Sequence, residues 1–223
     1  DALAIDFRSD DFRDVTQVTI YVQDHPGLFA RLSGAIAVTA ASVADAKIFT
    51  TRDGMALDSF WVQDAEQGAI KDPQQLERLE ASIRQTLSGE IIPARKLAEK
   101  PAIPKRTDVF KVAPAVFVDN RASNSHTVIE VNGRDRAGLL FDLARAFYDL
   151  NLSIASALVA TYGERAVDVF YVRDLFGHKI THPAKIKAVE ERLTEALEGG
   201  TSAKPRKAQS RTTAAMKGKA AAS

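Results

Sequence analysis

Two short turns carry the residues whose types and spacing best suit the binding of a small charged molecule. Residues 24–28 are Asp-His-Pro-Gly-Leu, and residues 135–139 are Asp-Arg-Ala-Gly-Leu. Each turn follows alternating apolar residues and precedes apolar residues at helical spacing, which predicts a strand, a tight turn and a helix N-terminus. The open N–H groups of such a helix attract a carboxylate, and the nearby Asp attracts an ammonium group. This arrangement matches a zwitterion such as an amino acid.

A plainer interpretation remains open for both turns: each Asp caps its own helix, and each Gly serves only the turn. Two serines that precede later strands, Ser42 and Ser153, could add a hydroxyl to the site, although Ser is also a common turn residue there. The residues predicted to bind a ligand are Asp24, His25, Gly27, Leu28, Ser42, Asp135, Arg136, Gly138, Leu139 and Ser153.

A second pair of carboxylates, Asp58 and Asp168, lies at strand positions with the same parity as the apolar residues Phe60 and Phe170. Strand side chains alternate between two faces, so this parity places each carboxylate on the apolar side. We expect each Asp to lie at the open end of its strand, where the hairpin satisfies it.

Several classes of chemistry are missing from the sequence. There is no Cys, which excludes disulfides, thiolate zinc sites and a cysteine nucleophile. The common nucleotide, hydrolase and zinc motifs are absent, as is any Asp-x-Asp or His-Asp pair. We therefore expect no catalytic residue and no metal site in this chain. Nucleic-acid binding is disfavoured as well, because Tyr21, Trp61 and Tyr171 are scattered among neutral or acidic residues.

Composition indicates a globular protein with a basic end. The hydrophobic fraction of 45% over 223 residues is enough for one or two cores. Segment 200–223 has basic but no acidic residues and few large apolar ones, which predicts a disordered tail with a weak tendency to contact anionic partners. No apolar run suits a membrane span or a signal peptide, so we expect a cytoplasmic protein. The first residue is Asp rather than Met, which suggests a piece of a longer chain.

The elements that position these residues occur twice. When the sequence is slid by 111 residues, Asp24 and Gly27 fall on Asp135 and Gly138, and the following apolar residues coincide as well. Each copy predicts a strand, a helix, a hairpin and a second helix. The hairpin turns are Arg-Asp-Gly at 52–54 and Tyr-Gly-Glu at 162–164.

A further strand in each copy completes the predicted fold. We place it before each copy, at about 4–8 and 115–119, with Ile91-Ile92 as a rival candidate. The fold class is α+β: two ferredoxin-like domains of the βαββαβ type, each an antiparallel sheet with two helices on one face. The predicted organisation is a first domain at 1–92, a Pro-rich linker at 93–114, a second domain at 115–199 and a tail at 200–223.

The repeated strand, Asp-x-x-Gly-Leu turn and helix resemble ACT domains, which are regulatory modules that bind amino acids and pair their sheets edge to edge. The longer stretches 24–36, 54–64, 128–140 and 161–177 are similar to the C-terminal tandem ACT region of the bifunctional uridylyltransferase/uridylyl-removing enzymes of bacterial nitrogen signalling. The resemblance covers about residues 4–198. Ala137 departs from it, because Pro is usual at that position of the turn.

This resemblance implies a parent enzyme that adds UMP to the PII protein and removes it. The implied catalytic parts are a nucleotidyltransferase domain and an HD-type phosphohydrolase domain with Mg or Mn. Neither lies in this chain, which we therefore expect to be non-catalytic and without a cofactor. The resemblance also implies glutamine as the effector, with high glutamine favouring UMP removal. The alternative is a stand-alone tandem ACT protein that regulates a partner through a small ligand. Which copy binds, and whether the ACT domains pair within or between chains, is left open.

Overall fold

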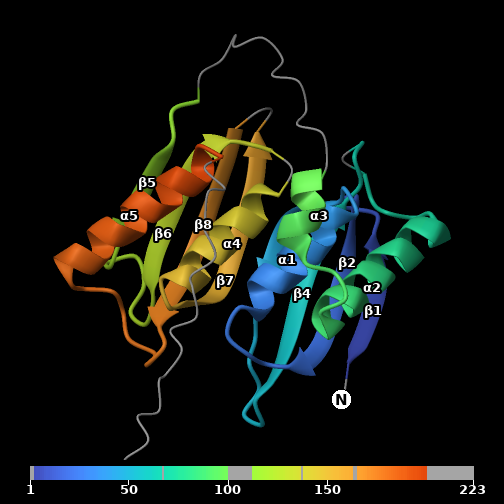
Figure 1. Cartoon of the computed structure of the whole chain (residues 1–223), viewed down its shortest axis with the longest axis horizontal. Coiled ribbons are helices and arrows are strands. Elements are labelled where there is room, and N and C mark those ends of the chain that lie inside the picture. The colour runs from blue at the N-terminus through green and yellow to red at the C-terminus, as the bar shows by residue number, and fades with distance from the viewer. Residues whose placement is uncertain (1–2, 67, 100–111, 137, 163–164, 200–223) are drawn as a thin grey trace, which may run out of the picture.

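The computed structural model describes residues 3–66, 68–99, 112–136, 138–162 and 165–199. Its helices cover one face of an antiparallel sheet (Figure 1). No helix within these ranges is long and apolar enough to cross a membrane. The elements of the first copy are β1 (Ala4–Asp10), β2 (Val15–Gln23), α1 (Leu28–Val38), β3 (Ser42–Lys47), β4 (Met55–Gln63), α2 (Pro73–Ser88) and α3 (Pro93–Glu99). Those of the second copy are β5 (Ala115–Asp119), β6 (Thr127–Arg134), α4 (Leu139–Asp149), β7 (Leu152–Tyr162), β8 (Arg165–Asp174) and α5 (Pro183–Leu197).

The strands of both copies form one eight-stranded sheet in the order β1-β2-β4-β3-β7-β8-β6-β5. Every neighbouring pair is antiparallel. The α+β class with helices on one face is confirmed. Within each copy the edge strand comes first, so the order along the chain is ββαββα, a permutation of the βαββαβ type.

The rival candidate for the edge strand, Ile91-Ile92, lies outside any strand. Gly89 ends α2 in the left-handed conformation with a φ of 86°. The chain then folds back, because the Ile91 N–H donates to the Gln85 carbonyl at 3.0 Å, and Pro93 starts a new helix. Segment 91–92 is thus used in closing one helix and beginning the next.

The two copies meet at a seam between β3 and β7. At its centre Ala46 lies opposite Ala157, and both side chains are buried beneath the helices. Above the seam α1 packs against α4 (Figure 1). The small side chains at the seam leave room for this close approach of two helices.

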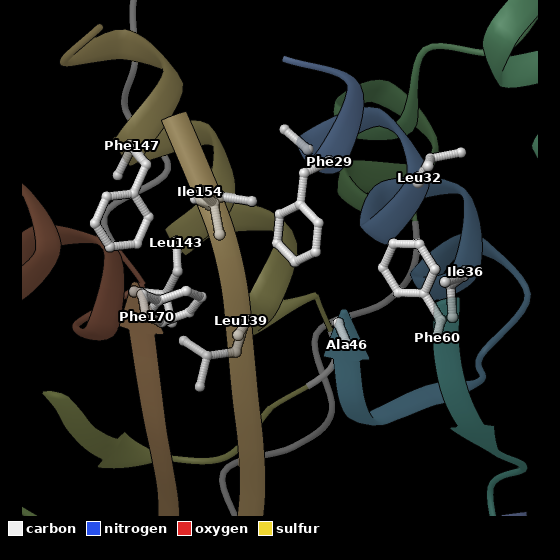
Figure 2. Close-up of a cluster of buried hydrophobic side chains, with 14 of the residues drawn as sticks. Phe29, Leu32, Ile36, Ala46, Phe60, Leu139, Leu143, Phe147, Ile154 and Phe170 are labelled. Atoms are coloured by element: carbon white, nitrogen blue, oxygen red, sulfur yellow. The ribbon is translucent and has the colours of Figure 1, made fainter. Parts of the chain in front are cut away.

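Each copy packs a pair of aromatic rings into its core, but from different ends of the helix. Phe60 stacks on Phe29, at the start of α1, with ring centroids 5.6 Å apart. The equivalent Phe170 packs instead against Phe147, near the end of α4, at 4.9 Å (Figure 2). The two copies therefore share the Phe on the sheet, but its ring partner comes from the start of the helix in the first copy and from near the end of the helix in the second.

Part of the predicted linker is a helix. The segment Pro93–Glu99 forms α3, which packs against α1. It begins with Pro and continues with good helix formers, a signal that the Pro-rich composition of 93–114 obscured. The rest of the linker at 100–111, Ala137, most of the 162–164 turn and the 200–223 tail fall outside the described residues.

We predict that Gly34→Ala destabilises the chain by about 1–2 kcal/mol, because a methyl group added there meets a crowded interface. A Cβ on Gly34 of α1 would lie 2.7 Å from side-chain atoms of both Phe141 and Pro93. This clash outweighs the better helix propensity of Ala. Urea unfolding measures the change, with the exposed Gln85→Ala on α2 as control. Equal stabilities of Gly34→Ala and the unsubstituted chain would contradict this packing.

Candidate functional site

A cavity of about 1040 Å³ lies between the two copies, with the first turn along one side. Residues 24–30 and the hairpin residues Ile48, Phe49 and Thr50 contribute the wall from the first copy. The facing wall comes from the second copy, namely the end of α4, the start of β7 and residues 173–175. The site is thus assembled across the seam and exists only when both copies are in place.

The first turn presents a helix N-terminus without a side-chain cap. Gly27 begins α1 with a φ of 86°, and no side chain hydrogen-bonds to the helix start. Asp24 does not cap this helix; its carboxylate accepts a hydrogen bond from the Thr50 hydroxyl at 2.8 Å. The carboxylate is therefore held beside the cavity by the hairpin, and the capping interpretation is wrong for Asp24.

The donors at this helix start differ from those predicted. The Leu28 N–H donates to the His25 carbonyl at 3.1 Å, which takes it out of reach of a ligand. The following amides, those of Phe29 and Ala30, lie in the first helical turn, where no intrahelical acceptor is available. Both residues line the cavity. Gly27 itself faces the Tyr148 ring, 3.0 Å from where a Cβ would lie, so a larger residue is excluded by space as well as by φ.

The second turn has the same backbone but different surroundings. Gly138 begins α4 with a φ of 79°, and no side chain caps that helix. A Cβ on Gly138 would lie 3.4 Å from Leu97 of α3, so the helix in the linker contacts this turn. Arg136, predicted to bind ligand, instead pairs with Asp142 at 2.5 Å and donates to the Ala196 carbonyl at 2.8 Å. Arg136 therefore links the second turn to the C-terminal end of α5.

Of the two predicted serines, one lies at the cavity and the other does not. Ser153, at the start of β7, lines the cavity opposite the first turn. Ser42 is exposed at the start of β3, opposite Gln63, and does not line this cavity. The cavity therefore brings together one part of the predicted set, namely Asp24, His25, Gly27, Leu28 and Ser153, and leaves out Ser42, Asp135, Arg136, Gly138 and Leu139.

Asp58 is the residue of this site whose role sequence reasoning misjudged. It lies within β4, opposite Ile20 of β2, rather than at an open strand end. Its side chain is 1% exposed, and neither carboxylate oxygen has a hydrogen-bond partner among the described residues. Burial raises the pKa of Asp58 to about 7, with the Asp24 charge adding to this and the Phe49 backbone opposing it. The expectation that the hairpin satisfies this carboxylate is met only in part, because the Phe49 backbone favours its charged form but no hydrogen bond of normal geometry holds it.

Asp168 repeats the arrangement in the second copy. It is 2% exposed, its Oδ1 atom lacks a partner among the described residues, and burial raises its pKa to about 7. The Asp135 charge adds to that shift, as Asp24 does for Asp58. The signal available in the sequence was the parity of both carboxylates with Phe60 and Phe170, repeated at the same place in each copy.

Comparison with known proteins identifies the class of this fold. A family model described as "ACR9-like, ACT-like domain" matches residues 115–201, the second copy. The second copy is thus an ACT-like domain, and the first copy has the same order of strands and helices. Among the described residues, no group of three or more His, Cys, Asp or Glu side chains is arranged to hold a metal ion.

Curated relatives narrow the identification. The chain is 51% identical over 197 residues to the bifunctional uridylyltransferase/uridylyl-removing enzyme of Azospirillum brasilense, covering 87% of this chain and 21% of that protein. It is 49% identical over 187 residues to the enzyme of the same description from Gluconobacter oxydans (83% and 20%), and 44% over 208 residues to that from Rhodospirillum rubrum (93% and 22%). The chain belongs with the C-terminal tandem ACT region of this enzyme family, which confirms the resemblance. It spans about a fifth of the length of these relatives.

Proposed function

We propose that this chain is the glutamine-sensing regulatory region of an enzyme that adds UMP to the PII protein and removes it. The observation that carries the proposal is the cavity between the copies, which is lined by both an uncapped helix start and a carboxylate. The similarity to uridylyltransferase/uridylyl-removing enzymes supplies the enzyme class. In this proposal the nucleotidyltransferase and phosphohydrolase domains, with Mg or Mn, belong to the parent enzyme in the cytoplasm.

The ligand would lie with its two charges on opposite features of the first turn. Its carboxylate would accept hydrogen bonds from the Phe29 and Ala30 amides, where the positive end of α1 also favours an anion. Its ammonium would contact Asp24, and the Ser153 hydroxyl lies on the facing wall for the remaining polar group. Both charged ends of the ligand would thus contact the first copy, and its remaining polar group would contact the second.

The surroundings of the two turns favour one ligand per chain. A side chain lies against each turn glycine, Tyr148 at Gly27 and Leu97 at Gly138, but only the first turn lines the cavity. We therefore assign the ligand to the first turn. Pairing of ACT domains between chains, in addition to the seam within this chain, stays a prediction.

Regulation follows from where the ligand sits. High glutamine would fill the cavity and hold the two copies in one arrangement, which favours removal of UMP in the parent enzyme. Low glutamine would empty it and favour addition. The states differ in the contacts between the first turn and the second copy's wall, which is the differential interaction that a ligand needs in order to shift an equilibrium.

We predict that Asp24→Ala weakens glutamine binding about ten- to a hundredfold, because a charge-assisted contact worth roughly 1.5–3 kcal/mol is lost. Isothermal titration calorimetry on the 223-residue chain measures the affinity. Asp135→Ala is the matched control and should bind glutamine normally, with one ligand per chain. Absence of heat with millimolar glutamine, or equal losses in both variants, would contradict the proposed site. Thermal melting of both variants separates binding losses from unfolding.

A further inference from the structure

We propose that Asp58 joins Asp24 in a two-carboxylate site that takes up the primary ammonium group of the ligand. This inference rests on the proposed function, in which the cavity binds an amino acid. It adds Asp58 to the residues that contact the ligand, and it adds the release of a proton to the binding step. Asp58 releases its proton as the ammonium enters, so binding of the ligand becomes coupled to pH.

The first argument is the position of Asp58. It shares a sheet face with Phe60, whose ring stacks on Phe29 in the first turn of α1. The Asp58 side chain therefore lies beneath the helix start that faces the cavity, and Asp58 is among the residues that line the cavity. A carboxyl group at this point is next to the space a zwitterion would fill.

The second argument is that the Asp58 carboxyl lacks a hydrogen bond of normal geometry. A buried polar group without a hydrogen bond costs free energy, and a buried charge without a counter-charge costs much more. Neither oxygen of Asp58 has a hydrogen bond of normal geometry among the described residues, although the Phe49 backbone favours the charged form. A cationic donor arriving from the cavity would supply Asp58 with the partner that it lacks.

The third argument is the charge of the neighbouring turn. Asp24 is close enough for its charge to disfavour ionisation of Asp58, in addition to the larger effect of burial. Two neighbouring carboxyl groups do not both ionise readily in a dry site unless a cation lies between them. An ammonium group has three N–H donors, enough to satisfy both carboxylates.

The remaining ionisable groups of the cavity do not supply that cation. Arg173, on the far wall, donates to the Ser125 carbonyl at 2.9 Å. Asp174 accepts backbone N–H groups of residues 176 and 178 at 2.9 and 2.8 Å. None of these groups hydrogen-bonds to Asp58. The other titratable residues lining the cavity are His25, His126, Tyr148 and Asp149.

The second copy provides a matched control. Asp168 is equally buried and lies near Asp135, as Asp58 lies near Asp24. Neither Asp168 nor the turn beside it lines the cavity. Asp168→Asn therefore removes the same kind of group from the same kind of strand without touching the ammonium site.

Calorimetric titration of the 223-residue chain with L-glutamine, in buffers of different ionisation enthalpy at pH 6.5, tests the proposal. We expect proton release on binding and an affinity that rises between pH 5.5 and 8. Asp58→Asn should weaken binding roughly tenfold or more and abolish the proton release. Asp168→Asn should change neither, and glutaramic acid, which lacks the ammonium group, should bind without proton release.

The outcomes separate this inference from the proposed function. Glutamine binding that is unchanged in Asp58→Asn would overturn the role of Asp58 and leave glutamine sensing intact. If glutamine gives no heat but another α-amino acid binds with Asp58-dependent proton release, the ammonium site is supported and the glutamine assignment fails. Binding of no α-amino acid overturns both.

Discussion

Replacing both Asp58 and Asp168 by Asn should raise the free energy of unfolding strongly at pH 8 and hardly at all at pH 4. In the folded chain the pKa of each carboxyl lies at about 7, above the ordinary value of 3.8. Below pH 4 both the folded and the unfolded states hold these protons, so they contribute no difference. Between pH 4 and 7 only the unfolded state ionises, and the stability of the native chain falls as pH rises.

Asn cannot ionise, so the free energy of unfolding of the double variant should not fall in this way as the pH rises. Each carboxyl should account for roughly 2–4 kcal/mol of the difference at pH 8. Urea unfolding at pH 4, 6 and 8 measures it, and Asp6→Asn on the exposed face of β1 serves as the control. Parallel pH profiles for the native chain and the double variant would show that these carboxyls are not held neutral. A variant that is more stable but binds ligand less well indicates a group retained for function.

Ala157→Asp should destabilise the chain by about 3–5 kcal/mol, because it places an unpaired charge in the dry centre of the seam. Ala157 is fully buried opposite Ala46, with α1 and α4 packed above. The neighbouring residue in β7, Leu158, points to the other face of the sheet and is 49% exposed.

Leu158→Asp is therefore the matched control, with the same new charge one residue along the same strand. It should change the free energy of unfolding by only about 0.5 kcal/mol. Urea unfolding of the two variants measures the difference. Equal losses would mean that β3 and β7 do not form a buried seam in solution, and the cavity between the copies would then not form either.

Local features of the fold were predictable because each is encoded within a few residues. The Asp-x-x-Gly-Leu turns, the hairpin at Asp53-Gly54 and the Pro73 helix start depend on φ angles and periodicity that neighbouring residues set. The repeat then transferred each assignment to the second copy. Even the edge strands were located this way, since their relation to the following strand is the same in both copies.

The site itself depended on contacts that no local pattern encodes. Ser153 was a candidate, but its position opposite Gly27 arises from the β3–β7 seam, which joins residues about a hundred positions apart. The contact of Leu97 with Gly138 required a helix within a Pro-rich segment. Asp58 was assigned to the hairpin because strand parity tells which face a side chain occupies and not how deeply that face is covered.

The walls of the cavity belong to two copies that share a seam of three residue pairs. A molecule bound there touches α1 of one half and the end of α4 of the other, so its affinity depends on how the halves are set against each other. Separation of the halves would lower the affinity for the ligand by some factor. By thermodynamic linkage, the bound ligand lowers the equilibrium constant for separation by the same factor. The concentration of such a ligand would therefore set how firmly the two halves of the single sheet are held together.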